Sequence, residues 1–297
     1  MDQRQQYLIG AGPFSFLMGL AGVAIFGATL PFTRLAVFDF DPWFVTFARA
    51  VIASLCAALV LWAMKVPFPR KDAGKLLWTG ILLVFGFPGF MAVAMSLVPA
   101  SHGGIVLGIL PLATTIFAFL IASERPTRLF WICSLLGTAT ILIYALRNGD
   151  GSFHWGDFWL LAAGTSASWG YVISGKLSRT YGGWQVACWF VVLTAPLSVI
   201  GTIWLWEDRY LQASATGLAA LGYLGLFSMF LGFFAWNTGL KIGGIAKVGQ
   251  VQLLQTFFTL GVSALLLGEE ITLEMLFFAV IVVAIVALGR RAQVGSK

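Results

Sequence analysis

Long apolar runs separated by short polar breaks dominate this chain. A membrane-spanning helix needs about 20 predominantly apolar residues, and ten such runs can be drawn between the breaks. The runs cover residues 14–37, 43–64, 76–98, 103–122, 129–146, 158–176, 184–206, 216–240, 246–267 and 272–289. Several connections are so short that neighbouring spans must be antiparallel. The pattern therefore predicts an all-α membrane protein with ten transmembrane helices.

Composition supports a protein with most of its mass in the bilayer. The chain of 297 residues is 59% hydrophobic and 10% charged, with a mean hydropathy of +0.91; ordinary soluble domains carry roughly 25% charged residues. The net charge of +6 comes from Lys and Arg in short loops, so it indicates topology rather than nucleic-acid binding. The three cysteines lie in apolar runs and predict neither a disulfide nor a metal site.

The basic residues predict the orientation. If the N-terminus is cytoplasmic, most of the 18 Lys and Arg fall in alternate, cytoplasmic segments, for example Lys71, Lys75 and Lys176. Acidic residues such as Asp39 and Asp41 fall on the opposite side. Because Lys and Arg accumulate in cytoplasmic loops, we expect both termini in the cytoplasm and the protein in the cytoplasmic (inner) membrane of a bacterium.

Two polar segments indicate an internal duplication. The pattern Glu-x-x-Thr occurs at residues 124–127 and again at 269–272, each time between long apolar runs. Phe26-Gly27 and Trp169-Gly170 occupy matching places in the first span of each half. Five spans per half place the second half upside down relative to the first, as in many secondary transporters. The sequence thus predicts two inverted five-helix repeats, residues 1–150 and 151–297.

These features together resemble a known family. An aromatic-Gly pair in the first span of each half, Arg49 in the second span, Pro111 in the fourth and Glu124 at its end are similar to the ten-helix EamA-type transporters of the drug/metabolite transporter superfamily. Within that family the aromatic content resembles the bacterial aromatic amino acid exporters. The resemblance implies a central substrate cavity lined by the first, third, fourth, sixth, eighth and ninth spans. Thr256 occupies the position where a counterpart of Pro111 would lie, so the sequence does not decide whether the ninth span bends as the fourth does.

Polar residues near the bilayer midplane are the candidates for binding a substrate. The ninth span carries a stripe on one helical face, which consists of Gln252, Gln255, Thr256 and Thr259. Amide groups both donate and accept, as the amino and carboxylate groups of an amino acid require, and Asn237 adds an amide in the eighth span. The alternative is that these side chains only hydrogen-bond one helix to another.

Aromatic rings are the second set of candidates. Many of the 26 Phe and 12 Trp residues lie near span ends, as interfacial belts do. Phe26 and Trp169 lie deeper and at symmetry-related positions, so they are predicted to face the substrate, by stacking or by attracting an ammonium group. The alternative for both is plain packing.

Two basic side chains have an open role. Arg49 lies within a span, where a charge is expensive, and it could hold a substrate carboxylate. Its distance of about two turns from the acidic end favours snorkelling to the interface or pairing with helix carbonyls. His102, in the turn after the third span, can titrate near neutral pH and is expected to be solvated.

Other classes of function find little support. No Asp or Glu lies deep within a predicted span, so we expect either facilitated movement of the substrate or coupling through other groups. Nucleotide-binding, metal and Ser-His-Asp patterns are missing from the sequence, so no enzyme activity, metal or cofactor is predicted. Breaks at Gly86-Phe87-Pro88-Gly89 and at Gly108 and Pro111 predict bent helices.

The sequence therefore predicts a secondary transporter that exports amino acids, with aromatic ones favoured, or related small metabolites by alternating access. Its substrate site is predicted at the midplane and consists of Phe26, Trp169, Asn237, Gln252 and Gln255. The alternatives are an exporter of hydrophobic cations, against which the lack of a membrane carboxylate argues, and a membrane-embedded enzyme or passive channel.

Overall fold

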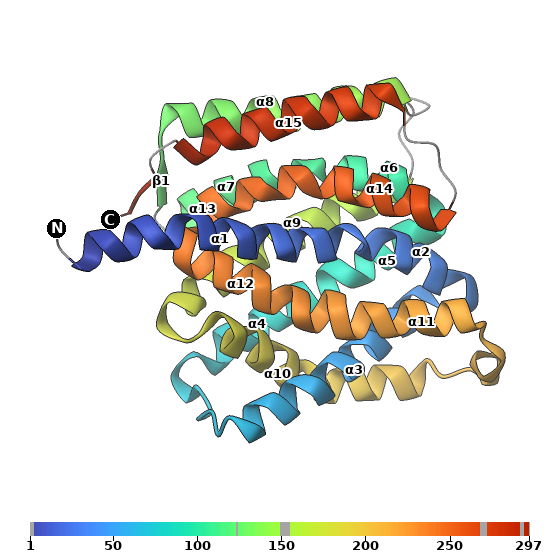
Figure 1. The fold of residues 1–297 in the computed structure, drawn as a ribbon. Coiled ribbons are helices and arrows are strands. Elements are labelled where there is room, and N and C mark those ends of the chain that lie inside the picture. The colour runs from blue at the N-terminus through green and yellow to red at the C-terminus, as the bar shows by residue number, and fades with distance from the viewer. Residues whose placement is uncertain (1–2, 123, 149–154, 268–271, 292–293, 297) are drawn as a thin grey trace.

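The computed structural model describes residues 3–122, 124–148, 155–267, 272–291 and 294–296. This part of the chain is almost entirely helical, and its helices lie roughly side by side in a bundle with the two chain ends at the same end of the molecule (Figure 1). Residues 269–271 of the second Glu-x-x-Thr segment lie outside the described residues. In the first segment, Thr127 accepts a hydrogen bond from the backbone N–H of Phe130 at 3.4 Å, which supports the start of the next helix.

In the first half the elements follow one another in a fixed order. They are α1 Gln3–Gly27, α2 Thr29–Asp39, α3 Pro42–Ala63, the 3₁₀ turn η1 Arg70–Asp72, α4 Ala73–Gly80, the π-helical turn η2 Ile81–Gly86, α5 Phe87–Leu97, α6 Ala100–Val106, the 3₁₀ turn η3 Leu107–Ile109, α7 Leu110–Ile121, β1 Glu124–Pro126 and α8 Arg128–Asn148.

The second half repeats much of that order. Its elements are α9 Trp155–Thr180, α10 Gly183–Trp204, the 3₁₀ turn η4 Asp208–Gln212, α11 Ala215–Tyr223, the π-helical turn η5 Leu224–Leu231, α12 Gly232–Gly243, α13 Ile245–Gly249, the 3₁₀ turn η6 Gln250–Leu254, α14 Gln255–Leu267, α15 Leu273–Arg291 and β2 Val294–Ser296. A π-helical turn and then a 3₁₀ turn interrupt corresponding helices of both halves at the same sequence interval. β2 pairs with β1 in an antiparallel two-stranded sheet.

Elements of the two halves alternate in the bundle. α1 packs against α12, α9 packs against α5 and α7, and α3 packs against α10. α8 and α15 lie side by side along one edge (Figure 1). Because each half contributes to every layer, neither half holds the centre of the molecule alone.

Six helical stretches of the described residues are long and apolar enough to cross a membrane. They are Pro13–Asp39, Pro42–Ala63, Arg70–Leu97, Gly183–Trp204, Ala215–Gly243 and Ile245–Leu266, and shorter apolar helices occur at Leu110–Ile121, Arg128–Tyr144 and Leu276–Ile285. α9 is 26 residues long but carries Asp157, Lys176, Arg179 and several Ser and Thr, which lower its hydropathy. Exposed Leu, Trp and Val side chains on the outer faces, such as Trp62 and Leu265, suit contact with lipid.

The helix breaks coincide with the predicted hinges. The π-helical turn Ile81–Gly86 directly precedes Phe87 and Pro88, and the hydroxyl of Ser166 donates to the carbonyl of Leu82 at 2.8 Å. A neighbouring helix thereby satisfies a carbonyl in an irregular turn, as non-helical backbone within a membrane requires. The ninth predicted span also breaks, at Gln250–Leu254, although it lacks a proline equivalent to Pro111.

Candidate functional site

A pocket of about 610 Å³ lies at one end of the bundle. Its walls come from α4, the end of α7 and the last turns of α9, and its lining includes Lys71, Lys75, Trp78, Lys176 and Tyr181. We call this end the lysine end, defined by Lys71, Lys75, Lys176 and Lys241. A volume of this size suits a small metabolite.

The rim of the pocket holds one carboxylate among the lysines. Asp72 accepts from Lys75 Nζ at 2.6 Å and from the hydroxyl of Tyr181 at 2.9 Å. The hydrogen bond to Asp72 raises the pKa of Tyr181 above its ordinary value, so the phenol remains a donor. Lys75 is 68% exposed, which makes the pocket rim both basic and accessible to water.

Trp169 lies one helical turn beyond the pocket along α9. Its ring stacks on Phe117 with centroids 6.0 Å apart and 7° between the planes, and it meets Trp78 edge-on at 5.7 Å. Trp78 and Ile173 both line the pocket. Since Ile173 follows Trp169 by four residues on the same helix face, Trp169 is placed between the pocket and the centre of the bundle.

Phe26 belongs to a different aromatic group. Its ring centroid lies 5.2 Å from Phe233, 6.3 Å from Trp236 and 6.4 Å from Tyr171. Tyr171 follows Trp169 by two residues, which directs the two side chains to different sides of α9. Phe26 and Trp169 therefore belong to different aromatic groups. Phe26, only 4% exposed, packs in the central aromatic cluster of Phe26, Tyr171, Phe233 and Trp236.

The glutamine stripe is buried where the two halves meet. The hydroxyl of Thr114 on α7 lies 3.3 Å from Gln252 Oε1 and 3.3 Å from the hydroxyl of Ser168 on α9. The buried Nε2 of Gln252 and Oε1 of Gln255 have no hydrogen-bond partner. Because an unpaired buried polar group is costly, these two amides have unused capacity to bind a solute.

The other members of the predicted polar set connect helices. Thr256 donates to the carbonyl of Gly104 at 2.9 Å, and Thr259 donates to the carbonyl of Gly27 at 2.8 Å. Asn237 accepts from Ser174 at 2.9 Å and donates to the carbonyl of Gly183 at 3.4 Å. These side chains are engaged in helix contacts of the kind that membrane bundles use, which leaves Gln252 and Gln255 as the stronger candidates.

Arg49 corrects one expectation. It was expected to snorkel to the interface or to pair with helix carbonyls. Instead it is 3% exposed, and its Nη2 donates to the side-chain hydroxyl of Ser228 in η5 at 2.8 Å. The hydroxyls of Ser228 and Thr29 are 2.8 Å apart. Snorkelling fails because α3 turns this side chain toward η5 and α2 rather than toward lipid.

His102 corrects a second expectation. It was expected to be a solvated loop residue, yet it lies in α6, and its Nε2 is 2.5 Å from Asp157 Oδ1. Asp157, in the first turn of α9, is 7% exposed. The sequence hid this contact because the two residues belong to different halves of the chain.

α2 and α11 lie together at the end of the bundle opposite the lysine end (Figure 1). Polar and aromatic contacts close this end. Asp39 accepts from the hydroxyl and the N–H of Ser214 at 2.5 and 3.2 Å. The N–H of Asp41 donates to the hydroxyl of Tyr210 at 3.3 Å, and that hydroxyl donates to Glu207 at 3.2 Å. We call this end the aspartate end, defined by Asp39, Asp41, Glu207, Tyr210 and Ser214.

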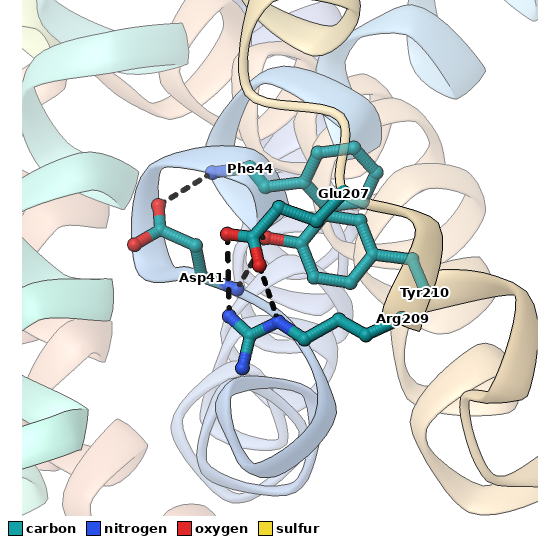
Figure 2. A network of polar contacts seen from close by, with 5 residues as sticks. All are labelled: Asp41, Phe44, Glu207, Arg209 and Tyr210. Atoms are coloured by element: carbon teal, nitrogen blue, oxygen red, sulfur yellow. Dashed lines mark hydrogen bonds and ion pairs between the residues drawn. The ribbon is translucent and has the colours of Figure 1, made fainter.

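Figure 2 shows how this closure is built from local elements. Asp41 accepts from the N–H of Phe44 at 3.2 Å and thereby caps α3, while Glu207 pairs with Arg209. The ring of Tyr210 lies 4.4 Å from that of Phe44. Burial raises the pKa of Tyr210 above its ordinary value, so its hydroxyl keeps the proton that it donates to Glu207.

Within the described residues, no group of three or more His, Cys, Asp or Glu side chains could hold a metal ion, and the cysteines Cys56, Cys133 and Cys188 are free thiols. Sequence reasoning missed Ser228, which accepts from Arg49, and Thr29, whose hydroxyl contacts that of Ser228. The sequence did contain a signal for these residues. Each is a polar side chain in an apolar run, either just after the Phe26-Gly27 pair or in an element that contacts the helix of that pair.

The bundle of apolar helices with buried polar groups between its halves defines a multi-pass α-helical membrane protein with an internal site, the class that includes solute transporters. The sequence model of the EamA-like transporter family matches residues 13–146 and, a second time, residues 154–289. The chain therefore belongs to the EamA-like transporter family and is a membrane transporter.

Individual relatives agree with this family. The Uncharacterized transporter YdeK of Bacillus subtilis (strain 168) is 40% identical over 277 residues, covering 93% of this chain and 96% of the relative. The Aromatic amino acid exporter YddG of Ancylobacter novellus is 26% identical over 208 residues, covering 68% of this chain and 69% of the relative. One crystal structure matches with a TM-score of 0.73 at 20% identity, over 93% of this chain and 98% of that one, which shows a shared fold.

Proposed function

We propose that this transporter exports amino acids, with aromatic ones favoured, or related small metabolites by alternating access. The observation that carries the proposal is the difference between the two ends of the bundle. A pocket of about 610 Å³ lies at the lysine end, whereas hydrogen bonds between α2, α3, η4 and α11 close the aspartate end. A site reached from one side at a time is the basis of alternating access.

The proposed architecture is ten spans in two inverted repeats, residues 1–150 and 151–297. The two successive family matches and the recurrence of the π-helical and 3₁₀ turns in both halves support the duplication. With both termini in the cytoplasm of a bacterial cell and the chain in the inner membrane, the lysine end faces the cytoplasm, as the distribution of basic residues favours.

The proposed path for the solute runs from the pocket past Trp169 to Gln252 and Gln255. The unpaired Nε2 of Gln252 and Oε1 of Gln255 support polar recognition, and the stacked rings of Trp169 and Phe117 support an aromatic substrate. Phe26 and Asn237 remain in the proposed site as its packed wall. The aromatic preference also draws on the relative named an aromatic amino acid exporter.

Uptake into liposomes that hold the purified transporter tests this function. We expect saturable uptake of labelled aromatic amino acids and faster uptake when unlabelled substrate is present on the trans side. Gln252→Ala should lower uptake. Gln250→Ala is the matched control: its Oε1 is also unpaired, but its side chain points to α8, where Nε2 bonds to Phe130 and Ser134, and not to α7 and α9. Flux that never saturates and shows no exchange would indicate a channel. If uptake by Gln252→Ala equalled that of the parent, the substrate site would lie elsewhere.

A further inference from the structure

Arg49 brings a positive charge into the middle of the bundle. Its side chain is 3% exposed and reaches from α3 to Ser228 in the π-helical turn η5, where Nη2 and Oγ are 2.8 Å apart. Ser228 in turn contacts the hydroxyl of Thr29 on α2 at 2.8 Å. Arg49 and Thr29 belong to the first half and Ser228 to the second, so this cluster spans both halves.

The charge of Arg49 has no counter-ion in the described part of the chain. The described acidic residues that form ion pairs form them elsewhere: Asp72 with Lys75, Asp157 with His102, Glu207 with Arg209, and Glu274 with Arg147. The guanidinium has five N–H donors, yet Ser228 is its single hydrogen-bond acceptor, and the buried Nε has none. A buried cation is stabilised by a compensating anion, and the unused donors of Arg49 can bind one.

The neighbours of Arg49 indicate what kind of anion fits. Gly232 follows Ser228 by four residues, and a Cβ built on Gly232 would meet Phe26 Cε1 at 2.7 Å. The ring centroid of Phe26 lies 6.4 Å from that of Tyr171, so the central aromatic cluster lies next to η5. A planar guanidinium matches a carboxylate in a bidentate arrangement. A carboxylate on Arg49 would therefore have aromatic surface directly beside it for the rest of the molecule. π-helical turns inside α-helices occur frequently at functional sites, and Ser228 lies in one.

We propose that Arg49, with Ser228 and Thr29, binds the carboxylate of the transported solute. This inference rests on the proposed transport function and narrows its substrates to molecules that carry a carboxylate. Hydrophobic cations would meet repulsion at this point. The serine and threonine hydroxyls would then hold the guanidinium in place while the aromatic cluster contacts the side chain of the solute.

Ligand-induced thermal stabilisation of the purified full-length protein in detergent tests the proposal without requiring transport. The probes are L-phenylalanine and L-phenylalaninamide, which differ in the carboxylate, and the anion controls are sodium chloride and sodium sulfate buffers that contain no carboxylate. We expect L-phenylalanine to raise the Tm and the amide to do so far less. In Arg49→Gln the apparent Kd for the acid should weaken by about 10- to 100-fold, as loss of a charge-assisted hydrogen bond implies.

Three further variants keep the test decisive. Arg34→Gln makes the same change in charge, but Arg34 donates to the carbonyls of Met95 and Val98, so L-phenylalanine binding should persist. Arg49→Lys should restore part of the affinity. Ser228→Ala keeps the charge and should weaken binding less than Arg49→Gln, which provides a readout if Arg49→Gln fails to fold.

The outcomes separate the two proposals. Equal stabilisation by acid and amide, no stabilisation by either, stabilisation by chloride in place of the carboxylate, or an unchanged Kd in Arg49→Gln would each overturn the role of Arg49. Absence of saturable solute flux in liposomes would instead overturn the transport function, even if carboxylate binding at Arg49 held.

Discussion

The lysine end and the aspartate end of this bundle use similar side chains for opposite purposes. At the lysine end, Asp72 holds Lys75 and Tyr181 at the rim of a pocket and leaves the space between α4 and α9 open. At the aspartate end, Asp39 and Asp41 bond across to Ser214 and Tyr210 and join α2 and α3 to η4 and α11. The carboxylate of Asp72 also reaches the second half, through Tyr181, but it lies at the rim of an open pocket. At the closed end, the carboxylate of Asp39 and the N–H of Asp41 join α2 and the start of α3 directly to α11 and η4.

This difference identifies the contacts that must break when the transporter turns over. Alternating access requires the aspartate end to open while the lysine end closes. The contacts at the closed end are hydrogen bonds and contacts between aromatic rings, each of which stabilises the closed form by about 0.5 to 1.5 kcal/mol. A closure made of several modest contacts can be reversed, because no single one dominates the energy.

The largest expected effect comes from fixing the aspartate end shut with the pair Asp39→Cys and Gly217→Cys. A Cβ built on Gly217 would lie 3.1 Å from Asp39 Cβ, close to the separation of about 3.5 to 4.5 Å found in disulfides. Oxidation should abolish uptake into liposomes, and a reducing agent should restore it. Each single cysteine variant is the control; full transport by the oxidised pair would mean that this end never opens.

A smaller loss is expected for Trp169→Ala, which acts between the lysine end and the centre. Removing the ring eliminates its stack on Phe117. The loss of this aromatic contact and of its buried area should lower the uptake rate or the substrate affinity by about tenfold. The initial rate of uptake of an aromatic amino acid into liposomes measures this loss. Trp204→Ala is the matched control because Trp204 is 84% exposed; an equal loss in both variants would remove Trp169 from the path.

A modest shift in the balance between the ends is expected for Tyr210→Phe. The change removes the hydroxyl that links the N–H of Asp41 to Glu207 and keeps the ring beside Phe44. At about 0.5 to 1.5 kcal/mol for the hydrogen bonds, the open form should become roughly two- to tenfold more populated.

A single cysteine at Ala36, which is fully buried in the aromatic and aliphatic cluster at this end, can report that shift. Its labelling by a membrane-impermeant maleimide should accelerate in Tyr210→Phe. Ser96→Ala, which removes an exposed hydroxyl bonded within its own helix, should leave the labelling rate unchanged. Equal rates in the parent and Tyr210→Phe would show that the hydroxyl does not contribute to closure.

The two ends also mark how far the sequence could lead. Apolar periodicity predicted helices throughout, and Pro88 and Pro111 indicated two of the breaks. The break at Gln250–Leu254 carries no proline and could not be found by local rules. Likewise Arg49 was placed near the acidic end by counting turns, whereas its burial depends on which helix faces α3, a question that only the packing of α3 on η5 decides.

The candidate site shows the same limit at the level of single side chains. Helical spacing correctly grouped Gln252, Gln255, Thr256 and Thr259, and all four are buried. It could not separate the two threonines, which bond to the carbonyls of Gly104 and Gly27, from the glutamines, which keep unpaired atoms. Partners in other helices make that distinction, and residue spacing within one helix carries no information about them.

The smallest effect is expected for Lys75→Gln at the lysine end. Lys75 is 68% exposed, and ion pairs of this kind contribute at most about 1 kcal/mol and are screened by salt. The apparent KM for an anionic or zwitterionic solute should rise less than about fivefold at low salt and converge with the parent as salt increases. Asp72→Asn should change more, because it disturbs Tyr181 as well as Lys75. If Lys75→Gln lowered uptake as much as Trp169→Ala, the lysine end would bind the solute directly and would not be a mere entrance. The two ends would then differ in solute binding, and not only in being open or closed.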